Sequence, residues 1–177
     1  SDNEYDNIEM ELKLLDPNNE VFKSVGYKGS FGQDYIHEIP MLSANKVQGD
    51  DPDDIQKWID TTCRYLGGVN PSDIDIVIEP KLDGVSIEVV YINGSLNHAV
   101  TRGNGKIGEL IDHSKLNLPK RLKKKGNYRI RGEAVIFKAD RSKLPDDAVL
   151  RNTCAGLLRK KELTSIEKSL IKFVPFQ

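Results

Sequence analysis

The sequence predicts an α+β fold in which helices accompany an antiparallel sheet. Apolar residues recur at helical spacing in two segments of the first 70 residues. From residue 74 the period changes, and runs rich in β-branched residues follow. The Asn93-Gly94 pair separates two such runs and is typical of a tight hairpin turn. At 177 residues, the chain is long enough to bury a core.

Two helices are expected before the strands begin. Ser1 and Glu4 fit a capping box, and apolar residues continue at helical spacing to residue 15. Residues 17–50 are loop-like in composition. A second helix is expected from the Asp-Pro pair at 51–52 to the two glycines at 67–68, which are typical of a helix end.

Strands are expected in the remaining two thirds of the chain. The first two are predicted at 74–81 and 85–92, and the Asn-Gly turn leads from the second into a strand at 95–103. A further alternating run predicts a strand at 128–137. A short helix around 153–161 then precedes a last apolar strand at 170–177.

The charge distribution divides the chain into an acidic and a basic half. Residues 1–100 carry 7 Lys and Arg against 19 Asp and Glu, whereas residues 101–177 carry 19 against 8. The basic half contains two dense clusters, at 118–132 and 151–162. Such clusters are expected of a surface that binds a polyanion, because neutralised phosphates release counterions. The alternative interpretation is an ordinary solvated surface.

Several classes of protein are disfavoured by composition. No apolar run reaches the length of a membrane span, and the first residues do not form a signal peptide. Cys63 and Cys154 are too few for a disulfide framework, and we expect both to be buried in a chain of a reducing, cytoplasmic compartment. No metal site follows from ligand spacing, and His37, His98 and His113 are expected to be structural or exposed.

The segment Glu79-Pro-Lys81-Leu-Asp83-Gly84 is the strongest candidate for chemistry. A protonated lysine is a poor nucleophile, so an enzyme that uses one lowers its pKa by partial burial or nearby positive charge. Leu82 and its apolar neighbours could desolvate Lys81, and Gly84 would let the backbone approach a bound phosphate. Arg102 and Arg131 would lie nearby if the predicted strands pair. The alternative is a solvated strand end that closes in an Asp-Gly turn.

The residues around Lys81 resemble a known family. KLDG at 81–84 is similar to the nucleophile motif of covalent nucleotidyltransferases, which comprise DNA ligases, RNA ligases and capping enzymes. Other blocks narrow the resemblance to the NAD-dependent DNA ligases and disfavour RNA ligases and capping enzymes. These blocks are SDNEYD at 1–6, HEIPMLSANKV at 37–47, EPKLDGVSIEVVYINGSL at 79–96, TRGNGKIGE at 101–109, RIRGEAVIF at 129–137 and RNTCAGLLR at 151–159.

The resemblance implies a role for each matching residue. Lys81 would accept AMP covalently, and Asp83 would hold the lysine and the metal-bound phosphate region. NAD and Mg²⁺ would be the cofactors, and nicked duplex DNA the substrate in replication and repair. Adenosine and its phosphate would contact Ser43, Glu79, Leu82, Gly84, Arg102, Glu133 and Phe176; the nicotinamide mononucleotide half would contact Asp2, Tyr5 and Asp6; and DNA phosphates would contact Arg151 and Arg159.

The match is partial, which shapes the expected organisation. The resemblance implies a remnant of a small helical domain at 1–16, a linking region at 17–50, and the first part of an antiparallel, ATP-grasp-like nucleotidyltransferase core at 51–177. The family's core continues with further strands, two of which carry lysines that contact AMP, and with an OB-fold. Either the chain is a fragment of a longer ligase, or a second chain supplies these parts, as in split bacteriophage ligases. In both cases the chain is expected to be inactive alone. Asn104 stands where the family usually has aspartate. The alternative function is a non-catalytic nucleotide- or DNA-binding module.

Overall fold

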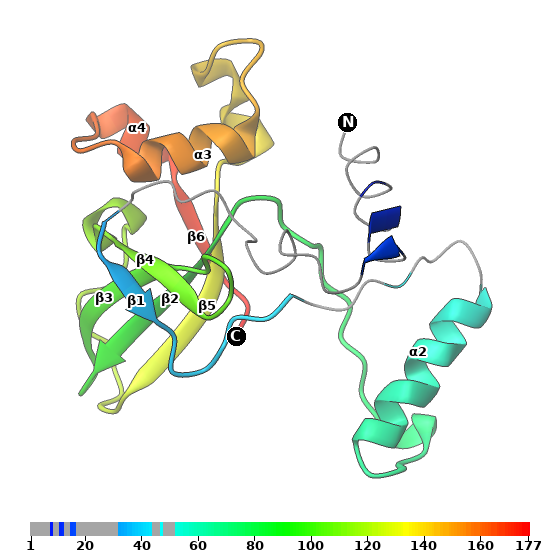
Figure 1. Cartoon of the computed structure of the whole chain (residues 1–177). Helices are drawn as coiled ribbons and strands as arrows, with labels where there is room; N and C mark the ends of the chain where they lie inside the picture. The colour runs from blue at the N-terminus through cyan, green and yellow to red at the C-terminus, as the bar shows by residue number, and fades with distance from the viewer. Residues whose placement is uncertain (1–7, 9–10, 13–14, 17–31, 44–46, 48–51) are drawn as a thin grey trace. The chain divides into compact units, whose positions relative to one another are not determined.

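The computed structural model describes residues 8, 11–12, 15–16, 32–43, 47 and 52–177 (Figure 1). The chain divides into two compact units, one formed by Ser1–Met41 together with Asp83–Gln177 and the other by Leu42–Leu82. We describe each unit by itself. The predicted boundaries at residues 16 and 50 fall at or beside residues outside the described part, and the domain assignment stays a prediction.

The larger unit contains a six-stranded sheet with the order β1-β4-β3-β2-β5-β6. All described pairings are antiparallel, which confirms the predicted class of helices with an antiparallel sheet. The strands are β1 (Asp34–Ile36), β2 (Val85–Ile92), β3 (Ser95–Thr101), β4 (Ile107–Ile111), β5 (Tyr128–Val135) and β6 (Lys172–Pro175).

The β2–β3 hairpin has the predicted Asn-Gly turn. Asn93 and Gly94 both have positive φ angles, 52° and 76°, as a two-residue turn with the twist of its strands requires. The connection from β4 to β5 packs on this turn, because the Gly94 amide donates to the Gly126 carbonyl at 2.7 Å. The hairpin turn and the β4–β5 connection therefore form one end of the sheet.

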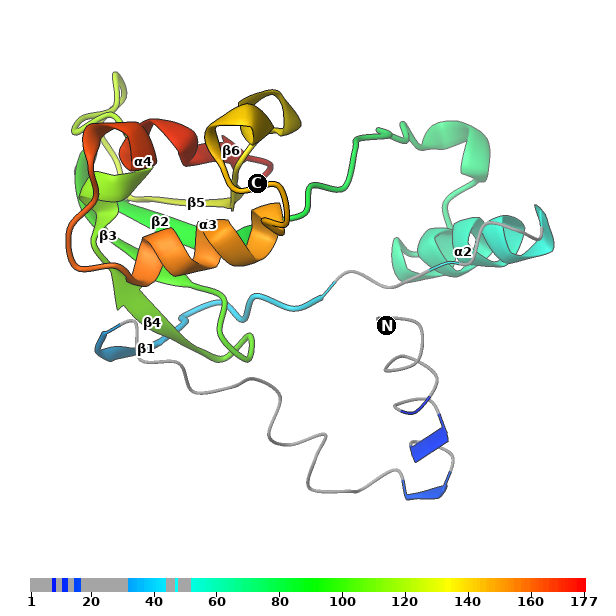
Figure 2. The same ribbon diagram turned by 90° about the horizontal axis from the view of Figure 1, so that it is seen from above.

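Helices α3 (Leu150–Arg159) and α4 (Ser165–Leu170) cover one face of the sheet (Figures 1 and 2). This face is apolar, because alternate residues of a strand point to the same side. Ile87 and Val89 of β2 and Ala134 of β5 are buried there with Leu158 and Leu170 of the helices. Short 3₁₀ helices in the described part of this unit are η3 (His113–Leu116) and η4 (Lys138–Lys143).

A buried lysine holds the carboxyl end of α3. Lys115 is 7% exposed, and its Nζ donates to the carbonyls of Leu158 at 2.8 Å and Lys160 at 2.6 Å. These carbonyls belong to the last turn, where a helix has no internal donors left and favours positive charge. Lys115 thus fixes the end of the helix that carries Arg159.

The smaller unit contains α2 (Pro52–Tyr65) and the short 3₁₀ helix η2 (Pro71–Asp73). The predicted second helix is confirmed, and Gly67 and Gly68 after it adopt φ angles of 92° and 82°. Cys63 is buried in α2, and Cys154 is buried in α3 of the larger unit; both are free thiols, as predicted.

The strand predicted at 74–81 is wrong. These residues are extended but pair with no strand among the described residues, and Val77 and Ile78 are 78% and 93% exposed. A β-branched run stays single when no neighbouring strand accepts its backbone groups, and Pro80 removes one donor. Conversely, β1, β4 and α4 form where no regular element was predicted.

The amino-terminal helix lies mostly outside the described residues. Ile8, Glu11, Leu12 and Leu15 are helical, as predicted. No described helix is both long and apolar enough to cross a membrane.

Candidate active site

Ser86 and Glu133 face each other on the sheet face opposite the helices. They are cross-strand neighbours in the pairing of β2 with β5, so their side chains point to the same side. Ser86 Oγ donates to Glu133 Oε2 at 2.7 Å, and both residues are partly buried. This hydrogen bond fixes one carboxylate oxygen of a residue predicted to contact ribose.

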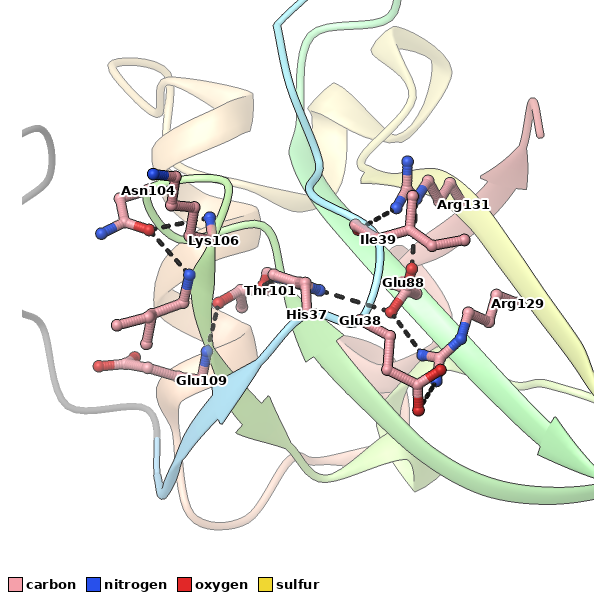
Figure 3. Close-up of polar contacts among 11 residues, drawn as sticks. His37, Glu38, Ile39, Glu88, Thr101, Asn104, Lys106, Glu109, Arg129 and Arg131 are labelled. Atoms are coloured by element: carbon pink, nitrogen blue, oxygen red, sulfur yellow. Dashed lines mark hydrogen bonds and ion pairs between the residues drawn. The ribbon is translucent and has the colours of Figure 1, made fainter.

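Arg102 is tied to the same end of β2. Its backbone amide donates to the Ser86 carbonyl at 2.9 Å, immediately after β3 ends. The tight turn that follows is closed by Asn104, whose Oδ1 accepts from the amides of Lys106 at 3.0 Å and Ile107 at 2.8 Å (Figure 3). An aspartate could accept the same two hydrogen bonds, so Asn104 keeps the shape of the turn and removes its charge.

Gly84 lies where β2 begins and contacts β5 closely. It is buried, and a Cβ at this position would lie 2.2 Å from the Ala134 carbonyl oxygen. The glycine is therefore required by strand packing, whereas the predicted approach to a phosphate stays a prediction. Asp83, the preceding residue, is exposed, and its Oδ1 lies 3.6 Å from Nη1 of Arg151 in the first turn of α3.

Phe176 lies one residue beyond β6, at the edge of the same face. The Phe176 amide donates to the Arg131 carbonyl at 2.9 Å. Val174, two residues earlier, pairs with Glu133, so alternation places Phe176 on the Glu133 side of the sheet. Its ring is about half exposed, at 54%, and offers a surface for stacking.

A buried carboxylate, Glu88, organises the centre of this face (Figure 3). Its side chain has no exposure, and two arginines of β5 bind it: Arg129 Nη1 at 3.1 Å from Oε1 and Arg131 Nε at 3.2 Å from Oε2. His37 Nδ1 lies 3.4 Å from Oε1. Removing a carboxylate from water is costly unless such partners replace the lost hydration.

His37 connects this cluster to the end of β3. Its Nε2 lies 3.1 Å from the Thr101 carbonyl oxygen, directly before Arg102. The segment after it is held by two further contacts, one from Arg131 to the Ile39 carbonyl and one from the Met41 amide to the Gly105 carbonyl at 2.8 Å. His37 is therefore structural, as predicted. Arg131 forms an ion pair with Glu88 within this unit.

Two groups around the site have shifted pKa values. Burial raises the pKa of Cys154 to about 12, with a smaller contribution from Glu133, and its Sγ donates to the Ala134 carbonyl at 3.3 Å. Burial and the nearby Arg129 guanidinium lower the pKa of His98, whose ring packs against Tyr35 with centroids 4.7 Å apart. Burial therefore opposes ionisation of the Cys154 thiol and protonation of the His98 ring.

Residues 29–177 match the sequence profile of the NAD-dependent DNA ligase adenylation domain. The chain belongs to this family. The match includes Lys81 and every residue of the sheet face described above. The polar end of β2 is therefore part of an adenylation domain, in agreement with the resemblance of the sequence blocks.

The chain is similar to several bacterial DNA ligases. This chain is 33% identical to the DNA ligase of Endomicrobium trichonymphae, with 91% of this chain and 27% of the relative covered. It is 32% identical to the Sorangium cellulosum DNA ligase, covering 98% and 29%, and 34% identical to that of Malacoplasma penetrans, covering 99% and 27%. The chain thus spans less than a third of the length of these ligases.

The predicted site residues of this adenylation domain are divided between the two units. Asp83, Gly84, Arg102 and Glu133 lie around the beginning of β2 in the larger unit, and Arg151 joins them through Asp83. Phe176 lies in the same unit, beyond β6, where its amide donates to the Arg131 carbonyl. Ser43, Glu79, Lys81 and Leu82 belong to the smaller unit, where all but the half-buried Leu82 are exposed. Asp2, Tyr5 and Asp6 lie outside the described residues. Arg159 lies at the opposite end of α3 from Arg151.

Sequence reasoning missed Ser86, Glu88 and the contact role of His37. The hydrogen bond from Ser86 to Glu133 depends on strand register, because the two residues are 47 positions apart in the sequence. Glu88 could have been found, because it is a single carboxylate inside the apolar run 85–92, and a buried carboxylate needs cationic partners such as Arg129 and Arg131.

Proposed function

We propose that this chain carries the AMP-accepting step of an NAD-dependent DNA ligase, with Lys81 as the nucleophile. One observation supports this most: Asp83, Ser86, Arg102 and Glu133 gather at the beginning of β2, the strand that follows Lys81 directly. Covalent geometry keeps the Cα of Lys81 within about 7 Å of that of Asp83, whatever the arrangement of the units.

The proposed reaction transfers adenylate to an amine. The neutral Nζ of Lys81 attacks the phosphorus of the AMP half of NAD and forms an N–P bond, while the P–O bond to nicotinamide mononucleotide breaks. The mononucleotide leaves with the electron pair, and the Nζ proton passes to solvent. Because only the neutral amine attacks, cationic neighbours and partial desolvation would raise the reactive fraction.

The remaining site residues would position the nucleotide. Glu133 accepts from Ser86 through Oε2, which leaves Oε1 to accept from a ribose hydroxyl. We propose that Arg102 contacts the ribose and that Phe176 stacks on adenine. Glu79, Ser43, Leu82 and Gly84 would complete the adenosine contacts, and Asp2, Tyr5 and Asp6 would bind the nicotinamide mononucleotide half.

Mg²⁺ would neutralise charge on the phosphates as the N–P bond forms. Among the described residues, no three metal-ligating side chains are grouped together. Mg²⁺ commonly takes one or two carboxylates and fills its other positions with phosphate oxygens and water, so the exposed Asp83 fits this mode of binding.

DNA binding would involve both ends of α3. Arg151 and Arg159 are eight residues apart, so they are separated by about 12 Å along the helix axis. We propose that each contacts a phosphate near the nick, with Arg151 closer to the reacting lysine. Sealing by the whole ligase would further need the downstream strands and an OB-fold, which we propose a second polypeptide supplies.

The test is the intact mass of the chain after incubation with NAD and Mg²⁺, with and without such a polypeptide. With that polypeptide present we expect one AMP, mapped by peptide sequencing to Lys81, and more adduct from NAD than from ATP; we expect no detectable adduct on the chain alone. Lys81→Arg should abolish the adduct, whereas Lys106→Arg, a change of an exposed lysine in the Arg102 turn, should leave it in place. An adduct on Lys106 or Lys115 would show that the assignment of the nucleophile is wrong.

The second candidate is a non-catalytic nucleotide- or DNA-binding module. The exposure of Lys81 in the smaller unit favours it, since lysines that act as nucleophiles are commonly desolvated in an apolar pocket. In that case the chain would bind NAD or DNA, and no adduct would form under any of these conditions.

A further inference from the structure

The connection between β4 and β5 presents a basic loop that the proposed adenylation step does not use. We define the basic loop as Lys120, Arg121, Lys123, Lys124 and Lys125, all of which are exposed. The printed sequence contains no Asp or Glu at 113–132, nor at 89–108, which includes the β2–β3 hairpin beneath the loop. The cations therefore lie on a part of the surface without carboxylates from either segment.

The backbone of the basic loop is held in place by the hairpin. The Leu96 amide donates to the Lys120 carbonyl at 2.9 Å, and the Leu122 amide donates to the Gly94 carbonyl at 2.8 Å. A bridge joins Ser95 to Arg121 between them. Loops that project only into solvent lack such cross-strand bonds, so this loop presents its charges from a fixed backbone.

Tyrosine hydroxyls anchor both ends of the basic loop. Tyr91, only 1% exposed, donates through its hydroxyl to the Pro119 carbonyl at 3.0 Å. Leu122 packs against the core, so the one apolar residue within the loop points inward while its neighbours point out. At the far end, the Tyr128 hydroxyl donates to the Lys125 carbonyl at 3.3 Å.

The described side chains of the basic loop form no ion pair or hydrogen bond within the chain. By contrast, Lys143 pairs with Asp140, and Lys160 pairs with Glu167. Five neighbouring cations without anions repel one another, and a folded protein gains little from that arrangement unless an external polyanion neutralises them.

We propose that the basic loop binds the phosphate backbone of duplex DNA at a distance from the reacting end of the sheet. This inference rests on the proposed ligase function for its choice of partner. Eight residues of β2 separate the loop from Asp83, which corresponds to about 25 Å, or roughly seven base pairs along a duplex. The loop would thus contact the duplex beside the nick and lengthen the footprint of the domain.

The side chains favour a duplex over other polyanions. No large apolar side chain between residues 113 and 128 is exposed, so the loop has nothing to insert into a lipid bilayer. Tyr128 is partly buried with its hydroxyl engaged, so the loop lacks an aromatic platform for unstacked bases. Lysine and arginine side chains that contact only phosphates do not distinguish bases, so we expect binding that does not depend on the DNA sequence.

The experiment measures binding of a fluorescent, intact duplex of about two helical turns over a range of salt concentrations. The test variant replaces Lys123, Lys124 and Lys125 with Gln. The control replaces Lys138, Lys143 and Lys168 with Gln, which changes the net charge equally at exposed positions elsewhere in the same unit. We expect the test variant to bind several-fold more weakly and to lower the slope of log K against log salt by about one to three units. The control should keep the slope of the unchanged chain.

Further arms decide the outcome. The three loop lysines replaced by Arg should retain the slope, because charge is retained. An equal loss of slope in test and control variants, or no loss in either, would overturn the proposal. So would stronger loop-dependent binding to anionic phosphatidylserine vesicles or to a poly-glutamate peptide than to the duplex.

The two proposals fail separately. Duplex binding through the basic loop does not need adenylation, so Lys81→Arg should show the same slope as the unchanged chain. Loop-dependent duplex binding without any AMP adduct would refute the proposed reaction and support the basic loop. If AMP attaches to Lys81 but the salt slope is the same with and without the loop lysines, the proposed reaction is supported and the basic-loop proposal is refuted.

Discussion

Glu88 is the residue on which the polar face of the sheet depends. It is fully buried, whereas its partners Arg129 and Arg131 retain 21% and 14% side-chain exposure. Together with His37 it joins the segment before Met41 to the strands that carry Arg102 and Glu133. The cluster therefore holds the backbone around the predicted site residues in place.

We expect Glu88→Gln to lower the free energy of unfolding by roughly 3 kcal/mol, because it leaves two guanidinium groups uncompensated. Glu38→Gln is the matched control. Glu38 also pairs with Arg129 but is 71% exposed, so its loss should cost less than about 1 kcal/mol. Urea unfolding of the three chains would measure both differences. Equal effects would contradict the central role of Glu88.

Gly84 gives a second prediction at the scale of a residue. A methyl group there would lie 2.2 Å from the Ala134 carbonyl oxygen and 2.6 Å from Val135 Cγ1, so β2 and β5 would have to separate. We expect Gly84→Ala to destabilise the fold by about 1–3 kcal/mol, as overpacking does. Gly156→Ala in α3 meets no atom within 4 Å and should instead stabilise by about 0.5–1 kcal/mol. Thermal unfolding would distinguish the two signs.

Helices α3 and α4 are linked by an ion pair at their junction. Glu167 completes the capping box of α4 with Thr164 and accepts from Lys160 Nζ at 2.8 Å, directly after α3. The hydrogen bond from Lys160, followed by the Thr164 amide, lowers the Glu167 pKa from 4.5 to about 2. The junction should therefore respond to acid.

The sign of this pH dependence follows from the lowered pKa. A carboxyl with a lower pKa in the folded state stabilises the fold above its unfolded pKa, and the contribution disappears as pH falls through the folded value. We expect Glu167→Gln to destabilise the chain above about pH 4.5 and to match the unchanged chain near pH 2. Unfolding measured at several pH values checks this, with the exposed Glu162→Gln as control. A difference that persists at pH 2 would be inconsistent with the ion pair.

The elements also show how far the sequence alone could be interpreted. The Asn93-Gly94 hairpin, α2 and α3 were predictable because their signals are local: a turn pair, glycine stops and helical spacing. The strand predicted at 74–81 failed because a strand needs a partner, and composition does not say whether one is available. The capping box at Thr164 was present in the sequence, so α4 could have been found.

The candidate site was predictable only where its residues lie in local sequence motifs. Motif blocks identified Asp83, Arg102 and Glu133, which the sheet brings to one end of β2. Ser86 contacts Glu133 through strand register, and His37 contacts a carbonyl 64 positions along the chain. A single sequence shows neither contact. The position of Lys81 relative to the larger unit stays a prediction.

At the scale of the whole molecule, Lys81 lies in the exposed, extended segment that precedes Asp83, at the boundary between the two units. Exposed segments without backbone partners are preferred sites of proteolysis. We expect trypsin to cut after Lys81 early in limited digestion. Adenylation would remove the positive charge that trypsin recognises, so incubation with NAD and Mg²⁺ should protect this bond if the proposed reaction occurs. Mass spectrometry of the fragments would show both effects, and early cuts confined to the basic loop would argue against an accessible segment at 74–82.

The short outer strand has a consequence for colloidal behaviour. β6 lies at one edge of the sheet and has four residues, beginning with Lys172 and ending with Pro175. An unprotected edge recruits strands from other molecules and seeds aggregates, whereas charge, proline and brevity discourage such recruitment. Pro175 has no amide hydrogen to offer, and Lys172 places a charge on the edge strand. The edge beside the Glu133 face is thus poorly suited to pairing with a second copy, which favours a dispersed chain at high protein concentration.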